Sequence, residues 1–174
     1  IIEEESLRLA AMATNVMNLT KVENQTILTD LTTFNLSEQI RACVLLLEEK
    51  WSRKELDLDL EFPEYTIRAN EELLKQVWIN LLDNAIKYSA PGGRITVKIW
   101  QGEYKAFIEI IDQGRGIPPE DLENVKTKFY KGSNSVRGSG IGLALVDSIM
   151  TALDGTMDLK STLGRGTVVT SGLP

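Results

Sequence analysis

The sequence contains no histidine and only one cysteine among its 174 residues. Without histidine, the chain cannot use an imidazole for acid–base catalysis or for metal binding. With Cys43 alone, no disulfide can form within the chain, which favours an intracellular protein. Cys43 lies in an apolar stretch, so we expect a small buried side chain rather than a reactive thiol.

The chain also lacks long hydrophobic runs. No apolar segment reaches membrane-spanning length, and no segment resembles a signal peptide. The net charge of −6 argues against a general nucleic-acid-binding protein. Hydrophobic residues make up 43%, which is enough for a packed core, and the length allows one domain plus an appendage. The chain begins with Ile1, and we expect it to be a piece of a longer protein.

The first 24 residues contain neither glycine nor proline and are expected to form a helix. Apolar residues recur in this segment with heptad-like spacing, namely Ile2, Leu9, Val16, Met12 and Leu19. Such a seam is typical of a helix that packs against a partner helix, although packing against its own domain would give the same pattern. A polar, turn-like stretch over 24–31 marks a boundary.

Beyond residue 30, helical patterns alternate with strand pairs. Ser37 is expected to cap a helix that ends near residue 54, and Asn70 to cap a second helix. A short helix is expected at 119–125 and a longer helix at about 140–153. Strands are expected at 32–36, 56–62, 65–69, 94–100, 106–112, 157–161 and 167–173. This mixture of helices and antiparallel hairpins predicts an α+β layered domain.

Three polar residues share one face of the helix that starts after Asn70. Asn80, Asn84 and Lys87 are spaced at i, i+4 and i+7 in an otherwise apolar segment. Neutral amide oxygens can bind a hard ion such as Mg²⁺, and lysine can meet phosphate as a point charge. Tyr88 could belong to the core or stack on a base, and the sequence alone leaves both possibilities open.

Two glycine-bearing segments follow. Asp112 ends an expected strand and enters Gly114–Arg115–Gly116, where glycines would let a base approach the backbone. Its carboxylate could accept a hydrogen bond from an adenine amino group, or simply stabilise a turn. The run 138–142 carries a glycine at every second position and leads into a helix. Backbone N–H groups at the start of a helix favour the binding of phosphate. This run fits neither the Walker nor the dinucleotide-binding pattern.

Taken together and in this order, the motifs resemble the catalytic, ATP-binding domain of bacterial sensor histidine kinases. That family belongs to a wider group shared with gyrase and heat-shock chaperone ATPases. The resemblance covers roughly residues 30–174. Its motifs are the asparagine box at 80–88, glycine boxes at 112–116, 138–142 and 164–167, and a phenylalanine box at 129–131.

The resemblance implies a two-layer α/β sandwich of the Bergerat type, in which helices cover a mixed, mostly antiparallel sheet. It also implies Mg²⁺ bound by Asn84 and Asn80, and Lys131 near the γ-phosphate, which makes Asn80 and Lys131 the catalytic candidates. Residues 126–140 would form a lid over ATP. The implied ATP-binding residues are Asn84, Lys87, Tyr88, Asp112, Gly114, Gly116, Ile117, Lys128, Tyr130, Lys131, Gly138, Ser139, Gly140, Ile141, Gly142, Leu143 and Thr167.

The chain departs from the family pattern in the implied lid. Lys126 and Thr127 stand where the family often has phenylalanine and glutamate, and lysine replaces arginine at 128 and 131. Lysine keeps the positive charge but loses the bidentate fork of arginine. We therefore expect weaker transition-state stabilisation with nucleotide binding retained.

The resemblance also implies a domain plan and partners. Residues 1–29 would be the end of the dimerisation helices plus a linker, and residues 30–174 the catalytic domain. The expected partners are ATP, the phosphoacceptor helix of the same or a partner subunit, and a response regulator receiver domain. The full-length protein is expected to be a homodimer without nucleic acid. The domain is expected to be cytoplasmic, and the membrane attachment of its parent protein is left open.

Three other functions are compatible with the same fold. An ATP-hydrolysing machine of the gyrase or chaperone type needs a carboxylate to activate water, and the matching position here is Asn80. A serine kinase acting on an anti-sigma partner fits the N-terminal helix and linker less well. A non-catalytic ATP-sensing module is supported only by the altered lid residues.

Overall fold

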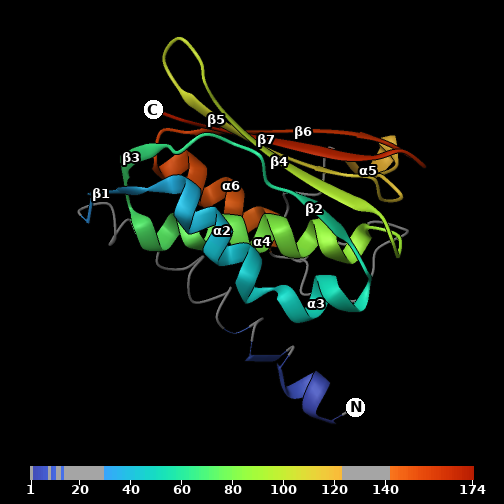
Figure 1. Cartoon of the computed structure of the whole chain (residues 1–174). Helices are drawn as coiled ribbons and strands as arrows, with labels where there is room; N and C mark the ends of the chain where they lie inside the picture. The colour runs from blue at the N-terminus through green and yellow to red at the C-terminus, as the bar shows by residue number, and fades with distance from the viewer. Residues whose placement is uncertain (1, 8, 11–12, 14–29, 123–141) are drawn as a thin grey trace.

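The computed structural model of the chain describes residues 2–7, 9–10, 13, 30–122 and 142–174. Within this part, a five-stranded sheet forms one layer and helices form the other (Figure 1). The strand order is β2-β4-β5-β7-β6, and only the β2–β4 pair is parallel. The expected α+β sandwich with a mixed, mostly antiparallel sheet is confirmed.

The sheet is built from β2 (Asp57–Asp59), β4 (Arg94–Gln101), β5 (Ala106–Asp112), β6 (Thr156–Thr162) and β7 (Gly166–Leu173). Side chains on β5 alternate strictly between buried and half-buried positions, as expected when one face of a sheet covers a core. β4 and β5 form the predicted hairpin, with Ile99 opposite Ile108. A separate two-stranded sheet pairs β1 (Thr32–Asn35) with β3 (Thr66–Ala69).

The helical layer contains α2 (Leu36–Leu46), α3 (Glu48–Arg53), α4 (Glu71–Tyr88) and α6 (Gly142–Ala152), with a one-turn helix α5 (Pro119–Leu122) after β5. α4 is the central helix and contacts both α2 and α6 (Figure 1). Its core face is the one predicted from the apolar spacing, and all four residues named for it are buried: Leu73, Val77, Leu81 and Ala85.

The start of α2 differs from the sequence prediction. The N-cap is Asn35, whose Oδ1 accepts from the N–H of Glu38 at 3.0 Å. Ser37 is instead fully buried, where its hydroxyl donates to Pro63 O and accepts from the N–H of Tyr65. These bonds attach the 63–65 segment to the helix, so tertiary contacts decide the role of Ser37.

The long helix expected up to residue 54 is broken at Leu47 into α2 and α3. At the break, Val44 O accepts both the N–H of Leu47 at 3.1 Å and the indole N–H of Trp51 at 2.9 Å. The tighter i to i+3 bond ends the regular α-helix there.

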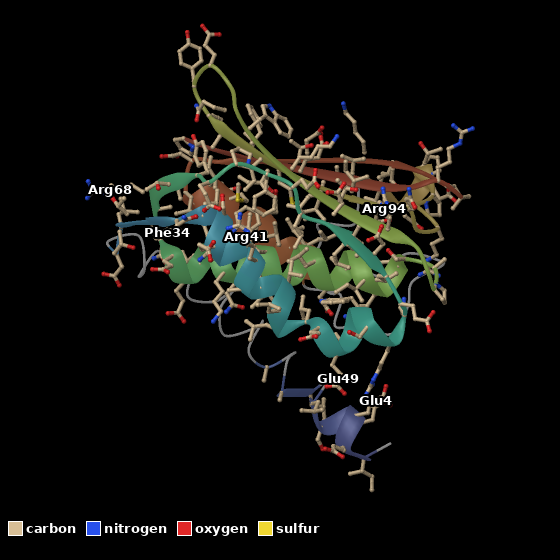
Figure 2. All side chains as sticks on the ribbon, viewed as in Figure 1. Glu4, Phe34, Arg41, Glu49, Arg68 and Arg94 are labelled. Carbon is tan, nitrogen blue, oxygen red and sulfur yellow. The ribbon has the colours of Figure 1, made fainter. Side chains whose placement is uncertain are left out.

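Arg41 on α2 joins this helix to the segment that precedes β3. Its guanidinium bonds Glu38, lies 2.6 Å from Glu64 and stacks 5.1 Å above the ring of Phe62 (Figure 2 labels Arg41). Because these groups are largely exposed, we assign them a role in orienting the segment rather than a large share of the stability.

Cys43 on α2 is buried, and burial raises the pKa of its thiol to about 11. The thiol is therefore protonated at neutral pH, as expected for a structural side chain. A membrane-crossing helix would need more length and apolarity than any helix has in the described residues.

Candidate functional site

The predicted site residues that the structure describes lie on four segments: the C-terminal half of α4, the end of β5 with the loop that follows it, the start of α6, and β7. Each segment is fixed locally. The side chain of Asn70 caps α4 by accepting the N–H of Leu73 at 3.0 Å, and acidic residues follow in the positive first turn. The helix thereby presents a rigid row of polar side chains.

Asn80 and the beginning of α6 face each other. The Nδ2 group of Asn80 donates to Gln76 O at 2.7 Å, one turn earlier in the same helix, so its Oδ1 points away from that carbonyl. A methyl group placed on Gly142 would lie 3.1 Å from this Oδ1. The asparagine helix and the second glycine segment therefore meet, with an amide oxygen at their junction.

The far end of α4 contacts the loop after β5. A Cβ on Gly114 would lie 2.2 Å from Tyr88 O, so only glycine fits at this approach. The guanidinium of Arg115 lies 4.8 Å from the centroid of the Tyr88 ring, a cation–π arrangement. One face of this ring is thus covered by Arg115, while Tyr88 itself is half-buried.

Asp112 lies at the end of β5 with 9% of its surface exposed. Its Oδ1 accepts from the N–H of Gly114 at 2.9 Å and of Thr167 at 3.3 Å. In the described residues, Oδ2 has no hydrogen-bond partner, which leaves one carboxylate oxygen for a donor group. Burial raises the pKa of Asp112 above its ordinary value, although the two N–H groups oppose this shift.

The terminal glycine segment packs on the same loop. The hydroxyl of Ser161 accepts from the N–H of Ile117 at 2.7 Å and contacts the hydroxyl of Thr167 at 2.8 Å. Gly166 has a φ of +118°, and a Cβ there would lie 2.1 Å from Asp112 O. The glycine is therefore required both by its backbone conformation and by the close approach of β5.

Lys87 is held by an ion-pair network on the polar face of α4. Its ammonium lies 3.0 Å from Asp83 Oδ2, while Lys50 of α3 lies 2.8 Å from Asp83 Oδ1. Burial would raise the pKa of Asp83, but the charges and hydrogen bonds of Lys87 and Lys50 outweigh it and lower that pKa. Asp83 is therefore a carboxylate at neutral pH, and it forms an ion pair with Lys87 across one turn of α4.

The structure thus describes some of the site residues predicted from the sequence and places them on neighbouring segments. Those within the described residues are Asn80, Asn84, Lys87, Tyr88, Asp112, Gly114, Gly116, Ile117, Gly142, Leu143 and Thr167. The predictions for Lys128, Tyr130, Lys131, Gly138, Ser139, Gly140 and Ile141 fall outside the described residues, as does the whole of the expected lid over 126–140.

Sequence reasoning missed several residues that shape this site. Ser161 connects two glycine segments, and Lys50 anchors the carboxylate that holds Lys87. The spacing of Asp83 and Lys87 at i, i+4 was a readable signal for an ion pair. Lys50 lies 33 positions from Asp83 and carried no such local signal.

Comparison with known proteins gives the family. Residues 69–174 match the family described as histidine kinase-, DNA gyrase B-, and HSP90-like ATPase. The circadian input-output histidine kinase CikA of Synechococcus elongatus is 29% identical over 99% of this chain and 24% of its own length. The signal transduction histidine-protein kinase ArlS of Staphylococcus aureus is 29% identical over 94% of this chain and 37% of its own length.

Solved structures agree with this assignment. A mycobacterial sensor histidine kinase, MprB, superposes with a TM-score of 0.75 at 28% identity, covering 83% of this chain and 97% of that chain. The present chain spans between a quarter and about two fifths of the two curated relatives named above. It belongs to the family of histidine kinase-, DNA gyrase B- and HSP90-like ATPases, as an ATP-binding catalytic domain of the sensor histidine kinase kind.

Proposed function

We propose that this chain holds MgATP so that its γ-phosphoryl group can be transferred to a histidine outside the chain. The sequence contains no histidine, so the acceptor must be supplied by another segment or subunit. Such phosphoryl transfer depends mainly on positioning and on neutralising charge, and both are tasks for a rigid site.

The observation that carries this proposal is the meeting of four sequence motifs around one helix. Asn80 Oδ1 lies against Gly142, and Tyr88 O lies against Gly114. Asp112 joins the loop after β5 to Thr167 on β7. These contacts join residues that lie 26 to 62 positions apart in the sequence, and they support a nucleotide site along the polar face of α4.

The amides of α4 suit a magnesium ion. The Nδ2 of Asn80 is engaged by its own helix, so the group available to a cation is its Oδ1, and Asn84 adds a second amide on the same face. Mg²⁺ prefers oxygen ligands and keeps waters and phosphate oxygens in its remaining positions. When bound, the ion would neutralise phosphate charge. Lys87 would contribute a positive charge one turn beyond Asn84.

Asp112 would select adenine. Because Oδ1 is occupied by two backbone N–H groups, Oδ2 can accept from an exocyclic amino group. Ile117 and Leu143, both half-buried, would line the base pocket. A guanine base presents a carbonyl where adenine presents the amino group, so we expect discrimination against guanine nucleotides.

The residue at position 80 favours transfer over hydrolysis. An amide cannot remove a proton from water, whereas ATP-hydrolysing relatives are expected to use a carboxylate at this position. Bound ATP would therefore persist until an acceptor histidine arrives. We expect the base that activates this histidine to lie near it, outside the chain.

The proposal includes a domain plan and partners. Residues 30–174 would be the catalytic domain, and residues 1–29 the end of a dimerisation helix and its linker. The phosphoacceptor helix of the same or a partner subunit would receive the phosphoryl group, and a response regulator receiver domain would take it next. The intact protein would be a homodimer with this domain in the cytoplasm.

A phosphotransfer assay tests the proposal. The chain is mixed with γ-labelled ATP, Mg²⁺ and a separately produced phosphoacceptor helix from a histidine kinase, together with a version in which the acceptor histidine is replaced by glutamine. We expect acid-labile label on the histidine-bearing helix only. Nucleotide binding without any transfer would favour the ATP-sensing alternative, and rapid release of inorganic phosphate without acceptor would favour hydrolysis.

A further inference from the structure

Lys54 makes an unusually complete set of contacts with the end of α4. It is the residue that follows α3, and its ammonium donates to Ile86 O at 2.8 Å, Lys87 O at 2.7 Å and Ser89 O at 3.0 Å. An ammonium group has three donors, and here all three are used by backbone carbonyls. Lys54 therefore caps the C-terminus of α4 with a positive charge.

The last carbonyl groups of a helix have no partner within the helix and carry its negative dipole end. Lys54 does not contact the carbonyl of Tyr88, the last residue of α4. Tyr88 O instead accepts the backbone N–H of Arg115 at 3.4 Å. Four consecutive carbonyls, from residue 86 to residue 89, are thus held by the Lys54 ammonium and by the backbone N–H of Arg115. One comes from α3 and the other from the loop after β5.

Lys54 is itself firmly placed. Its N–H donates to Ser52 O at the end of α3, and its own carbonyl accepts the N–H of Gly92 at 2.8 Å. The turn that leaves α4 is therefore attached to Lys54 at both its side chain and its backbone. A change at Lys54 would release the last turn of α4, which carries Lys87 and Tyr88, rather than the apolar core beneath its middle.

We propose that Lys54 is a positioning residue for the nucleotide site, which fixes the last turn of α4 so that Lys87 is presented to the phosphates. This inference rests on the proposed function, because it requires that Lys87 contact the nucleotide. Lys54 lies well before the first motif of the site in the sequence, and the contact is visible only in the folded chain.

The test compares the affinity of variants for ATP and Mg²⁺ by calorimetry, at a temperature where circular dichroism shows each variant folded. Lys54→Met keeps the apolar stem and removes the three donors. We expect its affinity to fall about tenfold, the scale of hydrogen bonds made by a charged group. Lys98→Met is the control, because Lys98 is exposed on β4, and we expect its affinity to stay within about twofold of wild type.

A double variant separates positioning from a general loss of stability. If Lys54 acts through Lys87, then Lys54→Met should cost little in a chain that already carries Lys87→Ala, so the two losses should not multiply. Losses that multiply, an unchanged affinity for Lys54→Met, or a Lys87→Ala variant that binds like wild type would each overturn the inference.

Two further arms keep the outcome clear. Should Lys54→Met not fold, Lys54→Gln carries the same test, since an amide keeps two donors without the charge, and we expect a smaller loss in the same direction. A wild-type chain that binds no adenine nucleotide would refute the proposed function itself. A wild-type chain that binds, with both Lys54 variants binding equally well, would refute the positioning role alone.

Discussion

Replacing Gly114 by alanine tests how closely the loop after β5 must approach α4. The new Cβ would lie 2.2 Å from Tyr88 O, 2.8 Å from Tyr88 C and 2.9 Å from Asp112 Oδ1. To reach an ordinary contact of 3.4 Å, the loop and the helix end must separate by roughly 1.2 Å. Two of the three obstacles are backbone atoms, so no side chain can rotate away to relieve the clash.

The clash should weaken nucleotide binding because it pushes apart two sides of the site. Overpacking of this kind typically costs about 1–3 kcal/mol. If this cost appears as loss of the binding geometry, the affinity for ATP should fall by roughly 5-fold to 150-fold. The displaced loop carries the hydrogen bond from Gly114 to Asp112, so the adenine contact should be lost together with the packing.

Calorimetric titration with ATP and Mg²⁺ measures the effect, and Gly164→Ala is the matched control. Gly164 has a φ of +82° and no atom within 4 Å of its would-be Cβ. Alanine there keeps the backbone N–H that donates to Arg115 O at 2.7 Å, so it should lower stability by about 1 kcal/mol through backbone strain while the loop stays attached. If Gly114→Ala binds ATP as tightly as the control, the close contact between the loop after β5 and the end of α4 is not needed for binding, and the reasoning is refuted.

Three further predictions concern Asp112, Ser171 and Asn70. Because burial raises the folded-state pKa of Asp112, the stability that this group contributes is present below its ordinary value of 3.8 and is lost as pH rises through the raised pKa. The affinity for ATP should instead fall as the pH drops through the raised pKa, because only the ionised carboxylate can accept the adenine N–H. Asp112→Asn should bind ATP weakly, with an affinity that does not change over this pH range. Ser171 is fully buried, and its hydroxyl has no hydrogen-bond partner among the residues that the structure describes. Ser171→Ala should therefore change the free energy of unfolding in urea by no more than about 1 kcal/mol, and a larger loss would contradict the structure. Asn70→Ala should lower that free energy by about 1–2 kcal/mol through loss of the α4 cap, whereas Asn70→Asp should restore most of it.

The central part of the fold could be predicted because local and global signals agree there. The apolar spacing of α4, its Asn70 cap and the alternating pattern of β4 and β5 each correspond to what the structure contains. The predicted N-cap of α2, Ser37, was wrong, because Ser37 and Asn35 are both residue types that cap helices well. The choice between them depends on Pro63 and Tyr65, which lie more than 25 positions away.

The part of the site that consists of short sequence motifs could be predicted. The asparagines of α4 and the glycines around Asp112 are local signals, and the structure brings their segments into contact. The supporting contacts were not predictable, because Lys54, Lys50 and Ser161 meet their partners only after folding. Nothing in their sequence neighbourhoods marks them, since isolated lysines and serines are most often solvated surface residues.

Titration of the chain with ATP in the presence of Mg²⁺ tests the central claim most directly. The account predicts saturable binding of one nucleotide per chain. It also predicts a sharp loss of affinity in both Asn84→Ala and Asp112→Ala, with the thermal unfolding midpoint of each variant close to that of wild type. A folded wild-type chain that shows no binding at millimolar ATP, or two variants that bind as tightly as wild type, would contradict it.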